Sequence, residues 1–116
     1  MQRDPRAFLW EVREAAFAIQ SFTAGMDAAA YAANEMAQAA VERKFEIIGV
    51  ALNQLARLDA ALAARVPDLP QIVAFRNQLI HGYATVNVSS VWNVIQNALP
   101  PLAGSVQALL DELGEA

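Results

Sequence analysis

Apolar residues recur along this chain at alternating spacings of four and three, and no other feature of the sequence restricts the fold as strongly. The pattern is longest in two series: Val41, Phe45, Ile48, Leu52 and Leu55, and Val91, Ile95, Leu99, Leu102, Val106 and Leu109. A repeat near 3.6 residues places apolar side chains along one face of an α-helix, whereas a strand requires strict alternation. The sequence therefore predicts helices that each bury one face.

Helix-start and helix-stop residues bound the first two predicted helices. Asp4 can cap the first helix, with Pro5 at its first position, and Gly25 ends it. Asn34 can cap the second helix, which we expect to run to about Ala64. The apolar stripe of the first helix consists of Phe8, Val12, Ala15, Ile19 and Phe22.

Residues of the same kinds bound the third and fourth predicted helices. Asp68 and Gln71 form a capping box at the start of the third helix, and Gly82 ends it. Either Asn87 or Ser89 can cap the fourth helix. Its interior contains Pro100-Pro101, and proline removes an amide donor and clashes with the preceding turn. Because the apolar stripe keeps its phase across the two prolines, we expect a kink and not two unrelated helices.

Together these segments predict an all-α fold, an up-and-down four-helix bundle with a kinked last helix. The 116 residues show no internal repeat or linker, so we expect a single domain over residues 1–116. Gly49 lies in the middle of the second helix, where glycine costs about 1 kcal/mol relative to alanine. Close packing of a neighbouring helix is the simplest explanation for it.

Composition narrows the classes of function. Hydrophobic residues make up 56% of the chain, and Trp10, Phe17 and Trp92 fall off the predicted core stripes. We therefore expect exposed apolar surface that is covered in a homodimer. Without cysteine there are no disulfides or thiolate ligands, and a single histidine disfavours a zinc site, so no metal or cofactor is expected.

Charge and hydropathy bear on the partners and the location of the protein. The formal net charge is −4, so any contact with nucleic acid has to be local and made by a few arginines. The apolar runs are too short to span a bilayer, and no signal peptide is evident. We expect a cytoplasmic protein without a membrane partner.

Most of the residues able to do chemistry lie in one segment, Arg76-Asn77-Gln78-Leu79-Ile80-His81-Gly82-Tyr83. It contains the only histidine of the chain. Asn77 and His81 are four residues apart and share a helix face, whereas Arg76 and His81 are about 140° apart around the axis. They can still converge on a ligand that lies over the helix end. An arginine fork suits phosphate, and histidine suits general acid catalysis.

A purely structural interpretation of this segment is also open. A histidine before glycine at a helix end can be a C-cap, and an arginine on a bundle helix can pair with a carboxylate. A tyrosine after a helix can pack its ring and expose its hydroxyl.

The spacing of Arg76, His81 and Tyr83 resembles the R-x4-H-x-Y motif of the HepT-like toxins in the HEPN superfamily. The segment around Gly49 is similar to the family's second helix, and the likeness covers roughly residues 5–110. Two positions depart from the family pattern. Val50 stands where the family commonly has glutamate, and Gln71 stands where it often has tryptophan.

The resemblance implies a HEPN-like fold and a metal-independent endoribonuclease that acts as a toxin on RNA. It implies a homodimer whose two motifs face one cleft, with Arg76 and His81 as catalytic residues and with Asn77 and Tyr83 as supporting, substrate-binding residues. It also implies a partner, an MNT-type nucleotidyltransferase antitoxin, which can silence the toxin by adenylylating Tyr83. The alternative is a non-catalytic subunit that binds a nucleotide or the nucleotidyltransferase through the same groove. The Arg76–His81 pair favours the enzyme, and Val50 with the acidic net charge favours the binding subunit.

Overall fold

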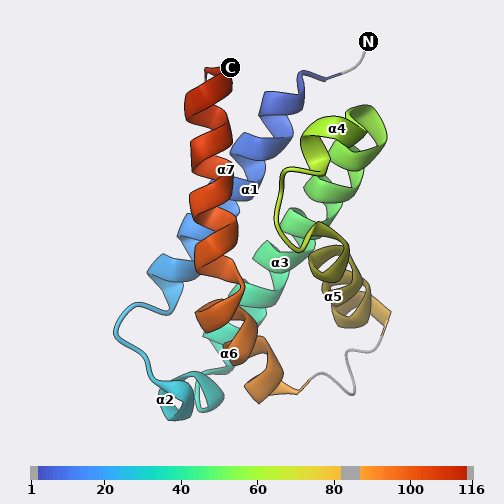
Figure 1. Ribbon diagram of the computed structural model, residues 1–116. Coiled ribbons are helices and arrows are strands. Elements are labelled where there is room, and N and C mark those ends of the chain that lie inside the picture. The colour runs from blue at the N-terminus through green and yellow to red at the C-terminus, as the bar shows by residue number, and fades with distance from the viewer. Residues whose placement is uncertain (1–2, 82–86, 115–116) are drawn as a thin grey trace.

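The computed structural model describes residues 3–81 and 87–114, and its helices form the predicted bundle (Figure 1). Within these ranges the helices are α1 (Pro5–Phe22), α2 (Ala28–Ala32), α3 (Glu35–Leu58), α4 (Ala60–Ala63), α5 (Leu69–His81), α6 (Val88–Asn97) and α7 (Leu99–Leu113). Figure 1 shows α1, α3, α5 and the α6–α7 pair running alternately down and up. The prediction of an all-α fold is confirmed.

Three of the predicted helix caps are confirmed. Asp4 accepts a hydrogen bond from the backbone N–H of Arg6 at 2.9 Å, at the start of α1. Asn34 accepts from Ala37 N–H at 2.9 Å before α3, and Asn87 caps α6. Each side chain satisfies a backbone donor that has no partner within its own helix.

One helix boundary and one helix cap differ from the prediction. The second predicted helix corresponds to α3, which ends at Leu58 and does not run to Ala64. The backbone of Asp59 leaves the helical conformation. The Asp59 carboxylate then accepts a hydrogen bond from Leu62 N–H at 3.0 Å and caps α4. An aspartate side chain can bond to nearby backbone amides in this way, and this gives the backbone an alternative to continuing the helix. Before α5, Asp68 has a left-handed backbone with φ of 58°, whereas a capping box uses an extended one.

The last predicted helix is kinked as expected. Ala98 alone separates α6 from α7, and its backbone remains in the right-handed helical region. The N–H of Ala98 still bonds to the carbonyl of Val94, and Leu102 N–H bonds to the carbonyl of Ala98. The break lies where Pro100 and Pro101 remove two amide donors.

The core is formed by the predicted stripes. The fully buried side chains of the three long stripes include Val12 and Ile19 on α1, Ile48 and Leu52 on α3, and Val106 on α7. α3 is the central element, because it packs against α1 and α5, and α1 packs in turn against α7. None of the helices in the described ranges is long and apolar enough to cross a membrane.

Four aromatic side chains test the predicted pattern of exposure. Trp10 and Phe17 are exposed as expected, at 47% and 45%. Phe22 was predicted to be buried but is exposed, because α1 ends there and the chain turns away at Thr23. Trp92 is partly buried instead of exposed, and its ring lies 5.3 Å from that of Tyr31.

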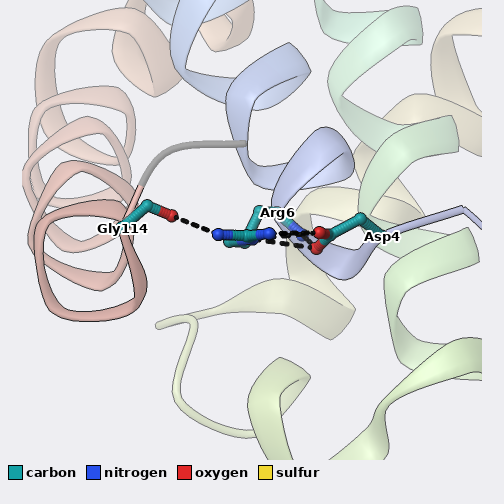
Figure 2. Close-up of polar contacts among 3 residues, drawn as sticks. All are labelled: Asp4, Arg6 and Gly114. Atoms are coloured by element: carbon teal, nitrogen blue, oxygen red, sulfur yellow. Dashed lines mark hydrogen bonds and ion pairs between the residues drawn. The ribbon is translucent and has the colours of Figure 1, made fainter.

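The two ends of the described chain lie together at one end of the bundle (Figure 1). Figure 2 shows the contact that joins them: Arg6 binds both carboxylate oxygens of Asp4 and donates to the carbonyl of Gly114 at 3.2 Å. The hydrogen bonds from Arg6 hold the pKa of the Asp4 carboxyl below its usual value. The pair is exposed, so we assign its role to orienting the ends and not to overall stability.

Tyr31 on α2 is buried with an unsatisfied hydroxyl. The residue is 1% exposed, and its Oη has no hydrogen-bond partner. Burial, with a smaller contribution from the negative charge of Glu42, raises the pKa of Tyr31 from 10.0 to about 12. A buried donor without a partner costs about 1–3 kcal/mol. The packing of the Tyr31 ring against Trp92 opposes this cost.

We expect Tyr31→Phe to increase the free energy of unfolding at neutral pH by about 1 kcal/mol, because it removes the unpaired hydroxyl and keeps the ring. The native state binds the phenolic proton more tightly than the unfolded state, so wild-type stability should fall as the pH rises from 10 to about 12. Urea unfolding curves measured from neutral to alkaline pH test both effects. An unchanged alkaline slope in the variant would show that another group causes it.

Candidate active site at the α3–α5 crossing

Helix α5 lies on α3 through two adjacent contacts that fix how the helices meet. The rings of Phe45 on α3 and Phe75 on α5 pack edge to face, with centroids 5.2 Å apart. The next residue of α5, Arg76, lies over Gly49, one turn further along α3. A Cβ added to Gly49 would overlap the Cβ and Cγ of Arg76 and lie 3.1 Å from its Cδ. The sequence-based explanation of Gly49 by close helix packing is therefore confirmed.

The side chain of Arg76 is partly buried at this crossing. Its Nε is enclosed and has no hydrogen-bond partner. One terminal nitrogen, Nη1, donates to Oδ1 of Asn77 at 3.2 Å. An unsatisfied buried N–H costs about 1–3 kcal/mol, so the native state carries a free-energy cost at this arginine. Such exceptions call for a specific explanation, and function is one of them.

Arg76 also differs from most arginines of the chain in its charge environment. Five arginines form ion pairs with carboxylates: Arg3, Arg6, Arg13, Arg43 and Arg65. Among the described residues, Arg57 and Arg76 form none. Arg57 is exposed on α3, whereas Arg76 is held at the helix crossing. Arg76 is thus a positioned cation that forms no ion pair with any carboxylate of the described residues.

Asn77 contacts Arg76 and lies on the same face of α5 as His81. It is exposed, and its carbonyl oxygen is engaged by Arg76. His81 is the last residue of α5 and is also exposed. Asn77 and His81 are four residues apart in a regular helix, so they lie on the same face. The Asn77 amide nitrogen can still donate two hydrogen bonds on that face.

The structure therefore brings Arg76 and Asn77 into direct contact, and it places His81 on the same helix face as Asn77. Gly82, predicted to end the helix, and Tyr83, predicted to be modified, lie outside the described residues. The contact between Gly49 and Arg76 was missed by sequence reasoning. A glycine inside an otherwise regular helix signals a close contact, but only the tertiary structure identifies its partner.

The surroundings of the crossing on α3 are mixed in character. Val50 follows Gly49 and is 38% exposed, so the position where the family commonly has a carboxylate is an apolar surface here. Glu42 lies two turns before Gly49, on nearly the same helix face. Burial, together with the nearby charge of Glu46, raises the pKa of Glu42. In the described part of the chain, no group of three or more histidine, aspartate or glutamate side chains is placed to hold a metal ion.

Comparisons with known proteins identify the family of the chain. The family model described as "Ribonuclease HepT-like" matches residues 12–109. The protein named "Putative RNase MJ1380" of Methanocaldococcus jannaschii is 30% identical over 108 residues, which cover 91% of this chain and 96% of that protein. "Probable ribonuclease HepT" of Thermococcus cleftensis is 28% identical, covering 94% and 98%. No solved structure gives a significant match. By its match to the family model over most of its length, this chain belongs to the HepT-like ribonuclease family.

Proposed function

We propose that this protein is an endoribonuclease that cleaves RNA with Arg76 and His81. The observation that carries the proposal is the state of Arg76: its stem is packed on α3, and no carboxylate in residues 3–81 or 87–114 forms an ion pair with it. Among the described arginines it is the one that is both partly buried and unpaired. A planar guanidinium in this state is suited to a phosphate group, which it can bind through two parallel hydrogen bonds.

The chemistry follows from these positions. The ribose 2′-hydroxyl attacks the adjacent phosphorus, which forms a 2′,3′-cyclic phosphate and releases the 5′-oxygen of the next nucleotide. Arg76 stabilises the negative charge that develops on the phosphate oxygens. His81 transfers protons at the attacking and leaving oxygens. Asn77 keeps the guanidinium in place and donates its amide hydrogens toward the substrate. This scheme needs no metal, because the nucleophile belongs to the RNA.

We further propose that the protein acts as a homodimer. Several large apolar side chains are exposed, and two of them, Trp10 and Phe17, are seven residues apart on one face of α1. Met36 and Val50 add exposed apolar surface on α3. A dimer with both motifs at one cleft would also double the local positive charge, which an acidic protein needs in order to hold RNA. Light scattering that gives the mass of a single chain at micromolar concentration would contradict this assembly.

The family resemblance extends the proposal to regulation. We expect a partner of the MNT type of nucleotidyltransferase, which acts as an antitoxin and transfers AMP from ATP to the hydroxyl of Tyr83. The new phosphate would add negative charge close in sequence to Arg76 and His81 and would repel the RNA backbone. It could also occupy the arginine fork.

A non-catalytic role as a subunit that binds a nucleotide or the nucleotidyltransferase is the second candidate. The observation that favours it is Val50, since an exposed apolar residue beside the Arg76 contact suits a protein partner better than RNA. The two candidates make opposite predictions for RNA cleavage by the purified chain.

We expect the wild type to cleave RNA in the presence of EDTA and His81→Ala to lose at least about 100-fold in rate, because a general acid–base is removed. Arg76→Ala should lose a similar factor in rate. Its melting temperature should change little, because the variant breaks no ion pair, and the lost packing of the stem is offset by removal of the buried, unsatisfied Nε–H. Arg57→Ala is the matched control, since it removes an equally unpaired arginine away from the motif. Equal losses in the Arg57 and Arg76 variants, or an inactive wild type, would favour the binding subunit.

We expect wild-type protein that is co-expressed with the nucleotidyltransferase to gain the mass of AMP, and Tyr83→Phe to gain none. Intact-mass analysis of both proteins measures this directly. Because phenylalanine differs from tyrosine only by the hydroxyl group, the two proteins should have similar melting temperatures. An equal mass increase in both would place the modification elsewhere and remove Tyr83 from the regulatory scheme.

A further inference from the structure

We propose that Gly49 is a positioning residue for Arg76: the absence of a side chain at Gly49 sets where the guanidinium lies. The inference rests on the proposed function only in assigning Arg76 to the scissile phosphate. Its structural part concerns α3 and α5 alone. It assigns to α3 a role in the site that does not require a functional group on that helix.

The contacts of Gly49 set it apart from the other helical glycine of the described chain. A Cβ added to Gly104 in α7 would meet nothing within 4 Å. A Cβ added to Gly49 would overlap the arginine stem at Cβ and Cγ, the atoms nearest the α5 backbone. These atoms cannot swing aside as the end of a flexible side chain can, so α5 itself or the first rotamer of Arg76 would have to change.

The consequence for the guanidinium follows from the length of the side chain. The stem lies on the α3 backbone, Nε is enclosed without a partner, and Nη1 reaches Asn77. A rotation of Arg76 away from α3 would let Nε reach water, but it would give up the contact with Gly49. The packed stem therefore holds the charged end at the surface of the crossing, with Asn77 fixing its orientation. Ordering of this kind lowers the entropy lost when a substrate binds.

We expect Gly49→Ala to fold and to lose on the order of 100-fold in kcat/KM for RNA, because displacement of a phosphate-binding group by about 1 Å has effects of this size. Gly104→Ala is the matched control and should leave kcat/KM unchanged. The second readout is independent of activity. NMR of the arginine Nε–H group should show slower exchange with water for Arg76 than for the exposed Arg57, and Gly49→Ala should abolish the difference.

The outcomes separate the positioning role from the function. If the wild type cleaves RNA and Gly49→Ala retains both its kcat/KM and a protected Nε–H, the positioning role is wrong and the proposed function stands. If the wild type does not cleave RNA but the Nε–H protection depends on Gly49, the function is wrong and the packing role stands. Faster Nε–H exchange together with lost cleavage supports both.

A thermal-melt cycle covers the case in which Gly49→Ala is too unstable to assay. Arg76→Gly removes the atoms that the new methyl group would overlap. Gly49→Ala should therefore lower the melting temperature of the wild type by at least about 5 °C and that of Arg76→Gly by much less. If the single variant does not fold, the double variant should still melt close to Arg76→Gly. An equal drop in both backgrounds, or a double variant that also fails to fold, would overturn the assignment of the clash to Arg76.

Discussion

The packing of the Arg76 stem on the backbone of Gly49 is the contact on which the candidate site depends. It lets α5 approach α3 closely, and the adjacent Phe45–Phe75 pair fixes the register of the two helices. A glycine in the middle of a long helix weakens that helix by about 1 kcal/mol relative to alanine. The buried stripe of α3 offsets this cost, since Val41, Ile48, Leu52 and Leu55 are all fully enclosed. The stable helix α3 can thus contain an unfavourable glycine at the position where the Arg76 stem packs.

The same contact bears on how an acidic protein would hold the phosphate site that we propose. The net charge of −4 gives no general attraction for RNA, and most arginines are already engaged by carboxylates. Arg76 is left unneutralised and partly shielded from water. Because electrostatic interactions are stronger where water is excluded, one such arginine contributes more to phosphate binding than a solvated one. In the proposed function, specific placement of a single charge takes the role that a basic surface has in many nucleic-acid-binding proteins.

Much of the fold could be predicted because it depends on local sequence. The stripes on α3 and on α6–α7, the caps at Asp4, Asn34 and Asn87, and the kink at the two prolines all follow from spacing and side-chain chemistry. Asp59 was misjudged because a cap inside a continuing apolar stripe is a competition between two local preferences. Phe22 was misjudged because the stripe has no partner beyond the end of α1.

The candidate site could be predicted only in part. The motif identified Arg76, Asn77 and His81, and the structure shows the first two in contact. The missing information was tertiary: spacing along one helix cannot reveal that Arg76 lies over a glycine of another helix. For the same reason the partly buried Trp92 escaped prediction, since its partner Tyr31 is on α2. Residues whose environment is made by another element are the ones that sequence patterns cannot assign.

The central claim is that Arg76 is the phosphate-binding cation of the site. Its most direct test is a titration of the protein, labelled at the arginine Nε, with an RNA oligonucleotide made uncleavable by 2′-deoxy substitution. We expect the Arg76 resonance to shift and saturate as the oligonucleotide binds, while that of the exposed Arg57 stays in place. An Arg76 resonance that does not move at saturation, or an equal shift of both resonances, would contradict the claim.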